Sequence, residues 1–249
     1  MMLKNIQTVL RSSLFAAGMW LSLLAYTPVM LVATLGPMPL RHRLLGTWAP
    51  LMLRWLRLTC GLDYRVEGIE NVPDQNCVVL SKHQSAWETI ALQLIFPNPC
   101  WVLKRELLWV PLFGWGLALT QPIAIDRKAG RKAMQQVLQQ GRQRLAEGRW
   151  VVVFPEGTRV APGQAGHYNI GGAMLAEKSA FPVLPVAHNA GEFWPRRGFL
   201  KRPGTVTVVI GPLIVTSGRR AAEINALAEA WIEGTMQRLS SGNESRTFP

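Results

Sequence analysis

The stretch that decides the fold is CVVLSKHQSAWE, residues 77–88. Its first part, Cys77 to Ser81, is apolar enough to predict a buried strand, and the segment from Thr89 to Ile95 is typical of a helix. His83 and Glu88 lie between them. A histidine at a strand end, with a carboxylate on its second ring nitrogen, has the chemistry of a general base with a fixed tautomer.

The geometry of this pair depends on where the helix begins. On a continuous helix, residues five apart differ by about 140° around the axis, so His83 must precede the helix and Glu88 must lie in its first turn. Ser85 fits that boundary because Ser85–Glu88 matches the S-x-x-E capping box. The same pattern permits a structural alternative in which Glu88 only caps the helix. Of the four histidines, His188 is the one serious rival as a base, since it follows a predicted strand.

Two further polar clusters follow predicted strands. One is Lys104-Arg105-Glu106, and the other is FPEGTR, residues 154–159. In the second cluster, Gly157 permits a close approach of the backbone to a ligand, and Arg159 has the fork geometry of a phosphate clamp. A surface turn and solvated cations are the alternatives for each cluster alone. Three polar clusters at strand ends predict one shared site.

Several catalytic chemistries lack their motifs in this sequence. There is no G-x-S-x-G elbow, no P-loop and no G-x-G-x-x-G. The three cysteines, Cys60, Cys77 and Cys100, are widely spaced and have no histidine near them, which indicates reduced thiols facing the cytoplasm. We expect no metal site and no cofactor. A histidine base without an enzyme nucleophile favours direct attack by a substrate hydroxyl.

Composition indicates a membrane-surface protein. The chain of 249 residues carries 27 Lys and Arg against 15 Asp and Glu, a net charge of +12, and 49% of its residues are hydrophobic, including 10 Trp. The cationic excess favours an anionic partner. Nucleic acid is disfavoured because no RNA-binding signature or zinc-ligand spacing accompanies the high apolar content.

The N-terminal region, residues 1–60, is predicted as a membrane anchor. Leu14 to Leu35 contains no charge and as a helix would reach about 33 Å, enough to cross the hydrocarbon. Thr27-Pro28 interrupts it, and basic residues flank both ends, which is compatible with both flanks on one side of the membrane. A cleaved signal peptide is the alternative, although no A-x-A site is evident.

The following segment, Arg41 to Thr59, is predicted as one amphipathic helix. Leu, Trp and Met recur along one face, and Arg43, Arg54 and Arg57 lie on the other. This arrangement favours a helix lying in the membrane interface. The alternative is a core helix that packs on the domain, with its arginines solvated.

From Gly61 onward, short apolar runs alternate with helical stretches, which predicts an α/β fold with a central, mostly parallel mixed sheet flanked by helices. The expected strands are Asp63–Val66, Cys77–Ser81, Cys100–Leu103, Pro122–Ile125, Trp150–Phe154, Val183–Ala187 and Thr205–Ile210. Lys128–Glu147 is the clearest helix; its basic face is solvated or docks an acidic carrier protein. Arg219–Leu239 is a second helix. Residues 61–240 thus form the α/β domain, and 241–249 a disordered tail.

Four ordered blocks carry a resemblance to the glycerolipid acyltransferases, and most closely to the 1-acylglycerol-3-phosphate acyltransferases. These blocks are His83–Glu88, Lys104–Leu107, FPEGTR (residues 154–159) and Val183–Val186, within a similar region from about Leu62 to Ile214. The N-terminal anchor also resembles the two-helix membrane motif of that family. One departure is Glu88, where the family usually has aspartate.

The resemblance implies transfer of a fatty acyl group from acyl-ACP or acyl-CoA to lysophosphatidic acid, giving phosphatidic acid in phospholipid biosynthesis. His83 would take the proton of the attacking hydroxyl while Glu88 holds the imidazole. The enzyme would act at the cytoplasmic face of the inner cell membrane, on a surface with anionic lipid. No cofactor is implied.

The other blocks receive binding roles from the same resemblance. Lys104 and Arg159 would bind the phosphate of the acceptor, with Arg105 as a reserve. Glu156 would position the glycerol, and backbone N–H groups near Gly157 and Thr158 would steady the oxyanion. The acyl-donor site would be bordered by Val183, Leu184, Pro185 and Val186.

Three alternatives remain open from the residues. A different acceptor, such as glycerol 3-phosphate, another lysophospholipid or a lyso-aminolipid, keeps the same chemistry. A thioester or lipid hydrolase would release free fatty acid. A non-catalytic membrane-binding module would bind liposomes without any acyl transfer.

Overall fold

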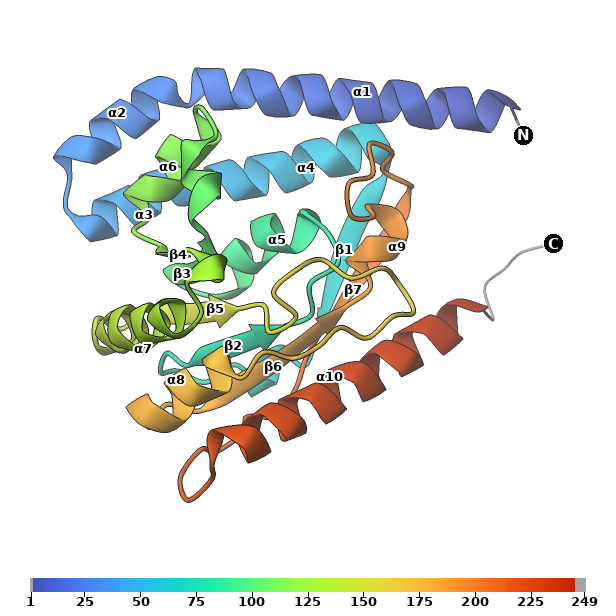
Figure 1. Cartoon of the computed structure of the whole chain (residues 1–249). Helices are drawn as coiled ribbons and strands as arrows, with labels where there is room; N and C mark the ends of the chain where they lie inside the picture. Colours follow the sequence, from blue (N-terminus) through green and yellow to red (C-terminus); the bar gives the residue numbers. More distant parts are fainter. Residues whose placement is uncertain (1, 245–249) are drawn as a thin grey trace.

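The sheet of this computed structural model is mixed and has helices on both faces (Figure 1). The structure describes residues 2–244, and within them seven strands pair in the order β1-β7-β6-β2-β5-β3-β4. The strands are β1 (Leu62–Glu67), β2 (Val78–Ser81), β3 (Pro99–Lys104), β4 (Ile123–Ile125), β5 (Trp150–Val153), β6 (Val183–His188) and β7 (Gly204–Ile210). Each predicted strand is confirmed to within one residue at either end.

The direction of the strands brings several loops to one edge. β2, β5, β3 and β4 are consecutive neighbours and pair in parallel, and β2 also pairs in parallel with β6. β6 and β7 form the antiparallel pair that makes the sheet mixed. Because parallel strands end at the same edge, the segments that follow β2, β5 and β3 emerge side by side. The predicted clusters follow these three strands.

Two helical layers cover the sheet. On one face lie α4 (Trp48–Cys60) and α5 (Trp87–Ile95), and on the other α7 (Arg131–Ala146), α8 (Gly171–Ser179) and α10 (Ala221–Glu244) (Figure 1). β2 serves both cores, since Val79 faces the first layer while Val78 and Leu80 face the second. The shorter helices are α6 (Phe113–Leu119), α9 (Ala190–Phe193), and the 3₁₀ helices η1 (Ile69–Asn71), η2 (Arg105–Trp109) and η3 (Arg127–Ala129).

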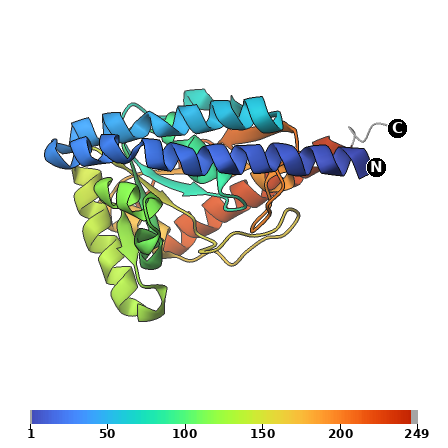
Figure 2. The same cartoon turned by 90° about the horizontal axis from the view of Figure 1, so that it is seen from above.

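The N-terminal region forms a helical layer above α4. α1 (Met2–Ala25) runs across the molecule, α2 (Thr27–Leu35) and α3 (Met38–Gly46) turn the chain, and α4 returns beside α1 (Figures 1 and 2). The predicted interruption is confirmed, because α1 ends at Ala25 and α2 begins with Thr27-Pro28. By length and composition, Asn5–Leu35 is apolar enough to cross a membrane. Many of its large apolar side chains are exposed: Leu10, Leu14, Trp20, Leu21, Leu24, Leu31, Val32 and Leu35.

The predicted amphipathic helix from Arg41 to Thr59 is two helices, α3 and α4, which meet at Thr47. The expectation of a membrane-facing apolar side is wrong for most of α4. Met52 and Leu56 are buried, and Trp48 and Trp55 pack partly against the same core. The apolar face of α4 is therefore covered by protein, because α1 lies over α4 and packs against it. This arrangement matches the core-helix alternative.

The C-terminal prediction also needs correction. α10 continues to Glu244, so the first residues of the predicted tail are helical, and residues 245–249 lie outside the described residues. The Ser241 hydroxyl donates to the Gln237 carbonyl one helical turn earlier, which accommodates this polar residue inside the helix. At the other boundary, α4 ends at Cys60 and β1 begins at Leu62; the division into anchor and catalytic domain stays a prediction.

Aromatic contacts fasten α1 to the α/β domain. Phe15 is fully buried and meets Trp194 edge to face at a centroid distance of 5.4 Å. The Lys201 ammonium lies 4.8 Å from the Trp194 ring centroid and 5.4 Å from that of Phe15. Burial lowers the pKa of Lys201, and cation–π contacts offset part of that cost. The Lys201 backbone N–H also donates to Ser12 Oγ on α1 at 2.9 Å.

Replacing Phe15→Ala tests this attachment. We expect the free energy of unfolding to fall by about 3 kcal/mol, because the substitution leaves a cavity between α1 and Trp194. Chemical unfolding in detergent measures the change. Leu14→Ala is the matched control, since Leu14 is 53% exposed and its truncation should cost less than about 0.5 kcal/mol. Equal losses for the two variants would contradict the proposed attachment.

Candidate active site

His83 and Glu88 meet as an ordered pair. The distance between His83 Nδ1 and Glu88 Oε1 is 2.8 Å. Glu88 is fully buried, whereas the His83 side chain is 12% exposed and lines a cavity. The His83 ring also stacks on Phe154, with centroids 4.1 Å apart. Because Glu88 occupies Nδ1, the nitrogen available to a ligand in the cavity is Nε2.

Glu88 performs both functions that the sequence left open. It lies in the first turn of α5, where its carboxylate accepts the backbone N–H groups of Gln84 and Ser85, and Ser85 Oγ accepts the N–H of Trp87. Burial raises the pKa of Glu88, but the electrostatic interaction with His188 and the hydrogen bonds from His83 and Ser85 outweigh burial, so the pKa lies below its usual value. The carboxylate is therefore charged at neutral pH, whether it caps the helix or holds the imidazole.

A second buried carboxylate holds the His83 backbone. Glu156 Oε2 accepts the His83 N–H at 2.8 Å, and Glu156 Oε1 lies 2.7 Å from Lys82 Nζ. The Val160 N–H donates to the His83 carbonyl at 2.8 Å, so the loop after β5 forms hydrogen bonds with both the N–H and the carbonyl of His83. The Glu156 side chain has no exposed surface, and burial raises its pKa against the opposing pull of Lys82.

Lys82 extends this network to the last helix. Its ammonium also contacts Glu233 Oε1 on α10 at 2.8 Å, and Tyr168 donates its hydroxyl to the same oxygen at 2.7 Å. Lys82 itself is fully buried. The buried cation is stable only with its carboxylate partners, because removal of one partner leaves an uncompensated buried charge. α10 is thereby linked to the residue that precedes the histidine.

His188 is excluded as a rival base by its surroundings. It is fully buried, its Nδ1 accepts the Ala190 N–H, and its Nε2 donates to the Lys82 carbonyl at 2.9 Å. Burial lowers the pKa of His188, so both ring nitrogens are occupied in a neutral, structural imidazole.

The cavity beside His83 has apolar walls and a cationic rim. Its volume is about 170 Å³, and it lies between the carboxyl edge of the sheet and the α4–α5 layer. Apart from His83, most of the lining is apolar: Trp48, Ile90, Trp101, Val102, Leu103, Leu107, Phe113, Leu117 and Phe154. The polar part of the lining comprises Lys104, Arg127, Arg159, Thr89 and Gln93. The structure therefore brings the predicted phosphate ligands Lys104 and Arg159 into the cavity of the histidine.

Other predicted residues lie around this cavity without lining it. Arg105 contacts Asp126 at 3.4 Å and is half exposed. Thr158 is exposed. The Gly157 N–H closes a turn to the Phe154 carbonyl at 3.0 Å, with φ of +66° that suits glycine. That N–H is engaged, so any oxyanion donors must come from neighbouring groups.

Val183, Leu184, Pro185 and Val186 form part of β6, at the centre of the sheet. All four are buried and pair with residues 78–81 of β2, and they do not line the cavity beside His83. By pairing with β2, these residues support the strand that directly precedes the His83 segment. A continuous apolar run is compatible with both a binding wall and a central strand, so the sequence alone did not separate these roles.

Sequence reasoning missed Lys82 and Arg127. Arg127 follows β4 and donates to the Gly157 carbonyl, so the rule that singled out Lys104 after β3 would also have found it. Lys82 gave no such signal, because its partners Glu156 and Glu233 are distant in the sequence.

Comparison with known proteins identifies the family. The family model described as Acyltransferase matches residues 63–189, the span that contains all four blocks. The chain belongs to the acyltransferase family. Within this span lie His83, Glu88 and the cationic rim, whereas Glu233, the partner of Lys82 on α10, lies outside it.

Individual relatives extend the similarity beyond the family core. This acyltransferase is 46% identical to a 1-acyl-sn-glycerol-3-phosphate acyltransferase of Pseudomonas aeruginosa, over 88% of this chain and 86% of the relative. It is 32% identical to a human 1-acyl-sn-glycerol-3-phosphate acyltransferase beta, over 68% of this chain and 62% of the relative. The crystal structure of PlsC, the 1-acyl-sn-glycerophosphate acyltransferase of Thermotoga maritima, has the same fold, with a TM-score of 0.79 and 22% identity over 95% and 97% of the two chains.

Replacing Glu156→Gln tests whether this carboxylate positions His83 or contacts the substrate. Glu156 accepts from Lys82 with one oxygen and from the His83 N–H with the other, and the amide replaces one of these oxygens by an NH2 donor, so the buried network loses a hydrogen bond. We expect kcat to fall by about 10- to 100-fold with little change in KM for the acceptor, and stability to fall by about 3 kcal/mol. Steady-state kinetics and chemical unfolding measure both effects.

Glu223→Gln is the control, because Glu223 on α10 forms an exposed ion pair with Arg219, which precedes this helix. It should leave kcat unchanged. A rise in KM with unchanged kcat for Glu156→Gln would instead support the predicted contact of Glu156 with the glycerol.

Proposed function

We propose that this enzyme transfers a fatty acyl group from an acyl thioester to the sn-2 hydroxyl of 1-acyl-sn-glycerol 3-phosphate, giving phosphatidic acid. The observation that carries the proposal is the His83 imidazole, held at Nδ1 by Glu88 and open to a cavity with apolar walls and a cationic rim. The names of the relatives described above support the same acceptor.

The reaction follows from the orientation of His83. Nε2 removes the proton of the acceptor hydroxyl as its oxygen attacks the thioester carbonyl carbon. The tetrahedral intermediate then collapses, the carbon–sulfur bond breaks, and the imidazolium returns the proton to the leaving thiolate. Glu88 stays ionised and stabilises the imidazolium while it exists, and no covalent acyl-enzyme is required.

The cavity matches the two parts of the acceptor. Its apolar lining suits a hydrocarbon chain, which gains free energy when it leaves water. Lys104 and Arg159 suit a phosphate, and Arg127 adds a third cation. Bound in this way, the free hydroxyl of the acceptor lies between its anionic head and its acyl chain, near His83.

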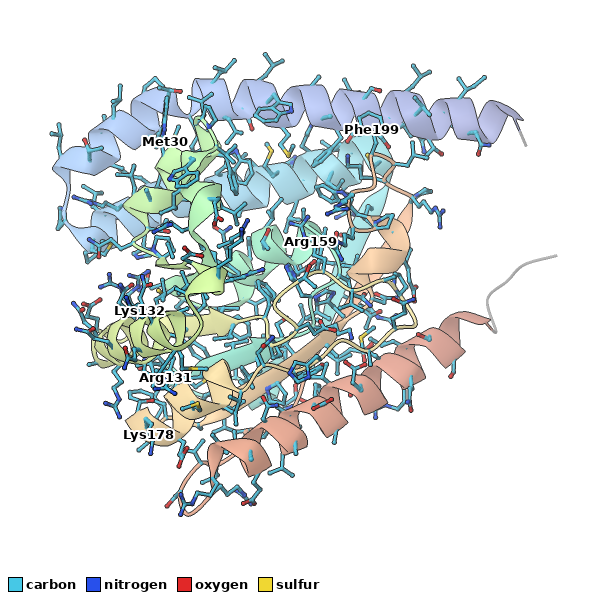
Figure 3. All side chains as sticks on the ribbon, viewed as in Figure 1. Met30, Arg131, Lys132, Arg159, Lys178 and Phe199 are labelled. Atoms are coloured by element: carbon cyan, nitrogen blue, oxygen red, sulfur yellow. The ribbon has the colours of Figure 1, made fainter. Side chains whose placement is uncertain are left out.

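The donor remains part of the proposal. Acyl-ACP and acyl-CoA both present the required thioester and both are anionic. The basic residues of α7, including Arg131 and Lys132, lie on the side of the molecule away from α1 (Figure 3). This face would attract either donor, and an acidic carrier protein is the larger partner that it would accommodate.

We also propose that the enzyme works at the cytoplasmic face of a membrane. The exposed apolar side chains of α1 and α2 support membrane contact. Cys60, Cys77 and Cys100 are free and buried, which fits a reducing compartment. The basic residues Arg41 and Arg43 beside α2 support contact with an anionic leaflet.

His83→Ala tests the general base. We expect kcat to fall by about 10²- to 10⁴-fold, because no other group is held at that place. Transfer of a labelled acyl group to lysophosphatidic acid measures the loss, and circular dichroism checks that the variant is folded. His167→Ala, an exposed histidine, should retain full activity. Near-normal turnover of His83→Ala would refute the mechanism.

Arg159→Gln tests the class of acceptor. We expect KM for lysophosphatidic acid to rise by about 10-fold or more, since a charge-assisted hydrogen bond to the phosphate is lost. Turnover of a monoacylglycerol, which lacks phosphate, should change little. Arg65→Gln is the control, because Arg65 is exposed on β1 and pairs with Glu67. A parallel loss on both acceptors would mean that Arg159 does not recognise the phosphate.

A further inference from the structure

The segment between β3 and β4 exposes a dense group of large apolar side chains. It contains η2, a short connection and α6. Within nine residues, Trp109 is 66% exposed, Trp115 57%, Leu107 41% and Phe113 37%. Single exposed apolar residues are ordinary on protein surfaces, whereas a contiguous group marks an interaction site.

The position of α6 indicates what this group contacts. α6 lies beside α2 (Figures 1 and 2). Gly116 on α6 is so close to Met30 on α2 that an added Cβ would lie 2.9 Å from the Met30 sulfur, and Figure 3 shows Met30 on the α2 side of α6. The η2–α6 segment therefore packs directly beside α2, on which Leu31 and Leu35 are exposed.

The residue types suit a lipid interface better than a protein partner. Tryptophan has an apolar ring and one N–H donor, and it is enriched where hydrocarbon meets headgroups. Arg105 Cζ lies 6.0 Å from the Trp109 ring centroid, which places a cation beside this aromatic residue, a pair that suits anionic lipid headgroups. With the net charge of +12, this chemistry complements an anionic leaflet.

We propose that the η2–α6 segment is a second membrane-contacting element of this enzyme, in which Trp109 and Trp115 insert into the same leaflet that α1 and α2 contact. This surface is separate from the N-terminal region predicted as the anchor. It places α6, and not only the first two helices, in the interface.

This contact has a consequence for substrate access, which rests on the proposed function. The cavity between α6 and the N-terminal helices is lined by Leu23, Tyr26, Met30, Gly116 and their neighbours. It shares Trp48, Gln93, Phe113 and Leu117 with the cavity of His83. Insertion of α6 would therefore bring these adjacent cavities close to the lipid from which an acceptor chain arrives.

Depth-dependent fluorescence quenching tests the contact without any catalysis. The three native cysteines are buried, so a thiol-reactive fluorophore will label an introduced cysteine selectively. Trp109→Cys and Trp115→Cys would be labelled in the full chain and mixed with vesicles of phosphatidylethanolamine and phosphatidylglycerol that carry spin-labelled lipid. We expect the fluorescence to fall by about two-fold or more, because insertion into the interface brings the fluorophore close to the spin-labelled lipid.

Two labelled positions serve as controls. Leu21→Cys on the exposed face of α1 should be quenched, and Lys178→Cys on α8, which lies away from α1 (Figure 3), should not. Quenching at positions 109 and 115 that is no greater than at 178 would overturn the proposal. Matching thermal unfolding of labelled and wild-type protein confirms that the fold is kept.

Charge substitutions measure the functional consequence. Trp109→Lys and Trp115→Lys should each weaken vesicle binding by roughly 10-fold, because each variant loses one aromatic ring that would be buried in the membrane. Transfer to a long-chain acceptor in vesicles should fall, whereas transfer to a short-chain acceptor dispersed as monomers should not. Leu227→Lys is the matched control, since it adds the same charge at an exposed leucine on α10, on the opposite face of the sheet.

The outcomes separate this proposal from the proposed function. Wild-type vesicle binding by both tryptophan variants would overturn the membrane contact. Absence of transfer by the wild-type enzyme on both acceptors would overturn the proposed function, and quenching at positions 109 and 115 would still support the contact.

Discussion

The buried carboxylate of Glu88 is the interaction on which the site depends. It accepts the Gln84 and Ser85 N–H groups at the start of α5, and it holds His83 Nδ1 at 2.8 Å. A charged group without exposed surface is tolerated because each oxygen is satisfied. The same hydrogen bonds set where the helix begins, which ring nitrogen faces the cavity, and which charge balances the imidazolium.

A second carboxylate, that of Glu156, positions the backbone of His83, whereas Glu88 positions its imidazole ring. Glu156 connects the loop after β5 to His83, and Lys82 connects Glu156 to Glu233 on α10. These groups belong to three segments that meet only in the folded chain. The parallel pairing of β2, β5 and β3 makes this possible, because their carboxyl ends form one edge.

The proposed membrane contact and the proposed chemistry share one architecture. α1 covers α4, Trp48 at the start of α4 lines the cavity, and the exposed apolar surface lies on α1, α2 and the η2–α6 segment. A water-insoluble acceptor would then reach His83 along apolar walls, with Lys104 and Arg159 at the polar end.

The sequence by itself determined the strands, the break at Thr27-Pro28, the pairing of His83 with Glu88 and the arrival of Lys104 and Arg159 at a shared site, because local periodicity and strand ends encode these features. Only the tertiary structure decided that α4 is covered, that Glu156 faces Lys82 and the His83 N–H, and that the strand containing Val183–Val186 pairs with β2 inside the sheet. These outcomes depend on which distant segment packs against each surface. The sequence of an apolar face or of a buried charge does not identify its partner. In this chain Lys82 meets Glu233 only because α10 packs against the sheet beside the end of β2.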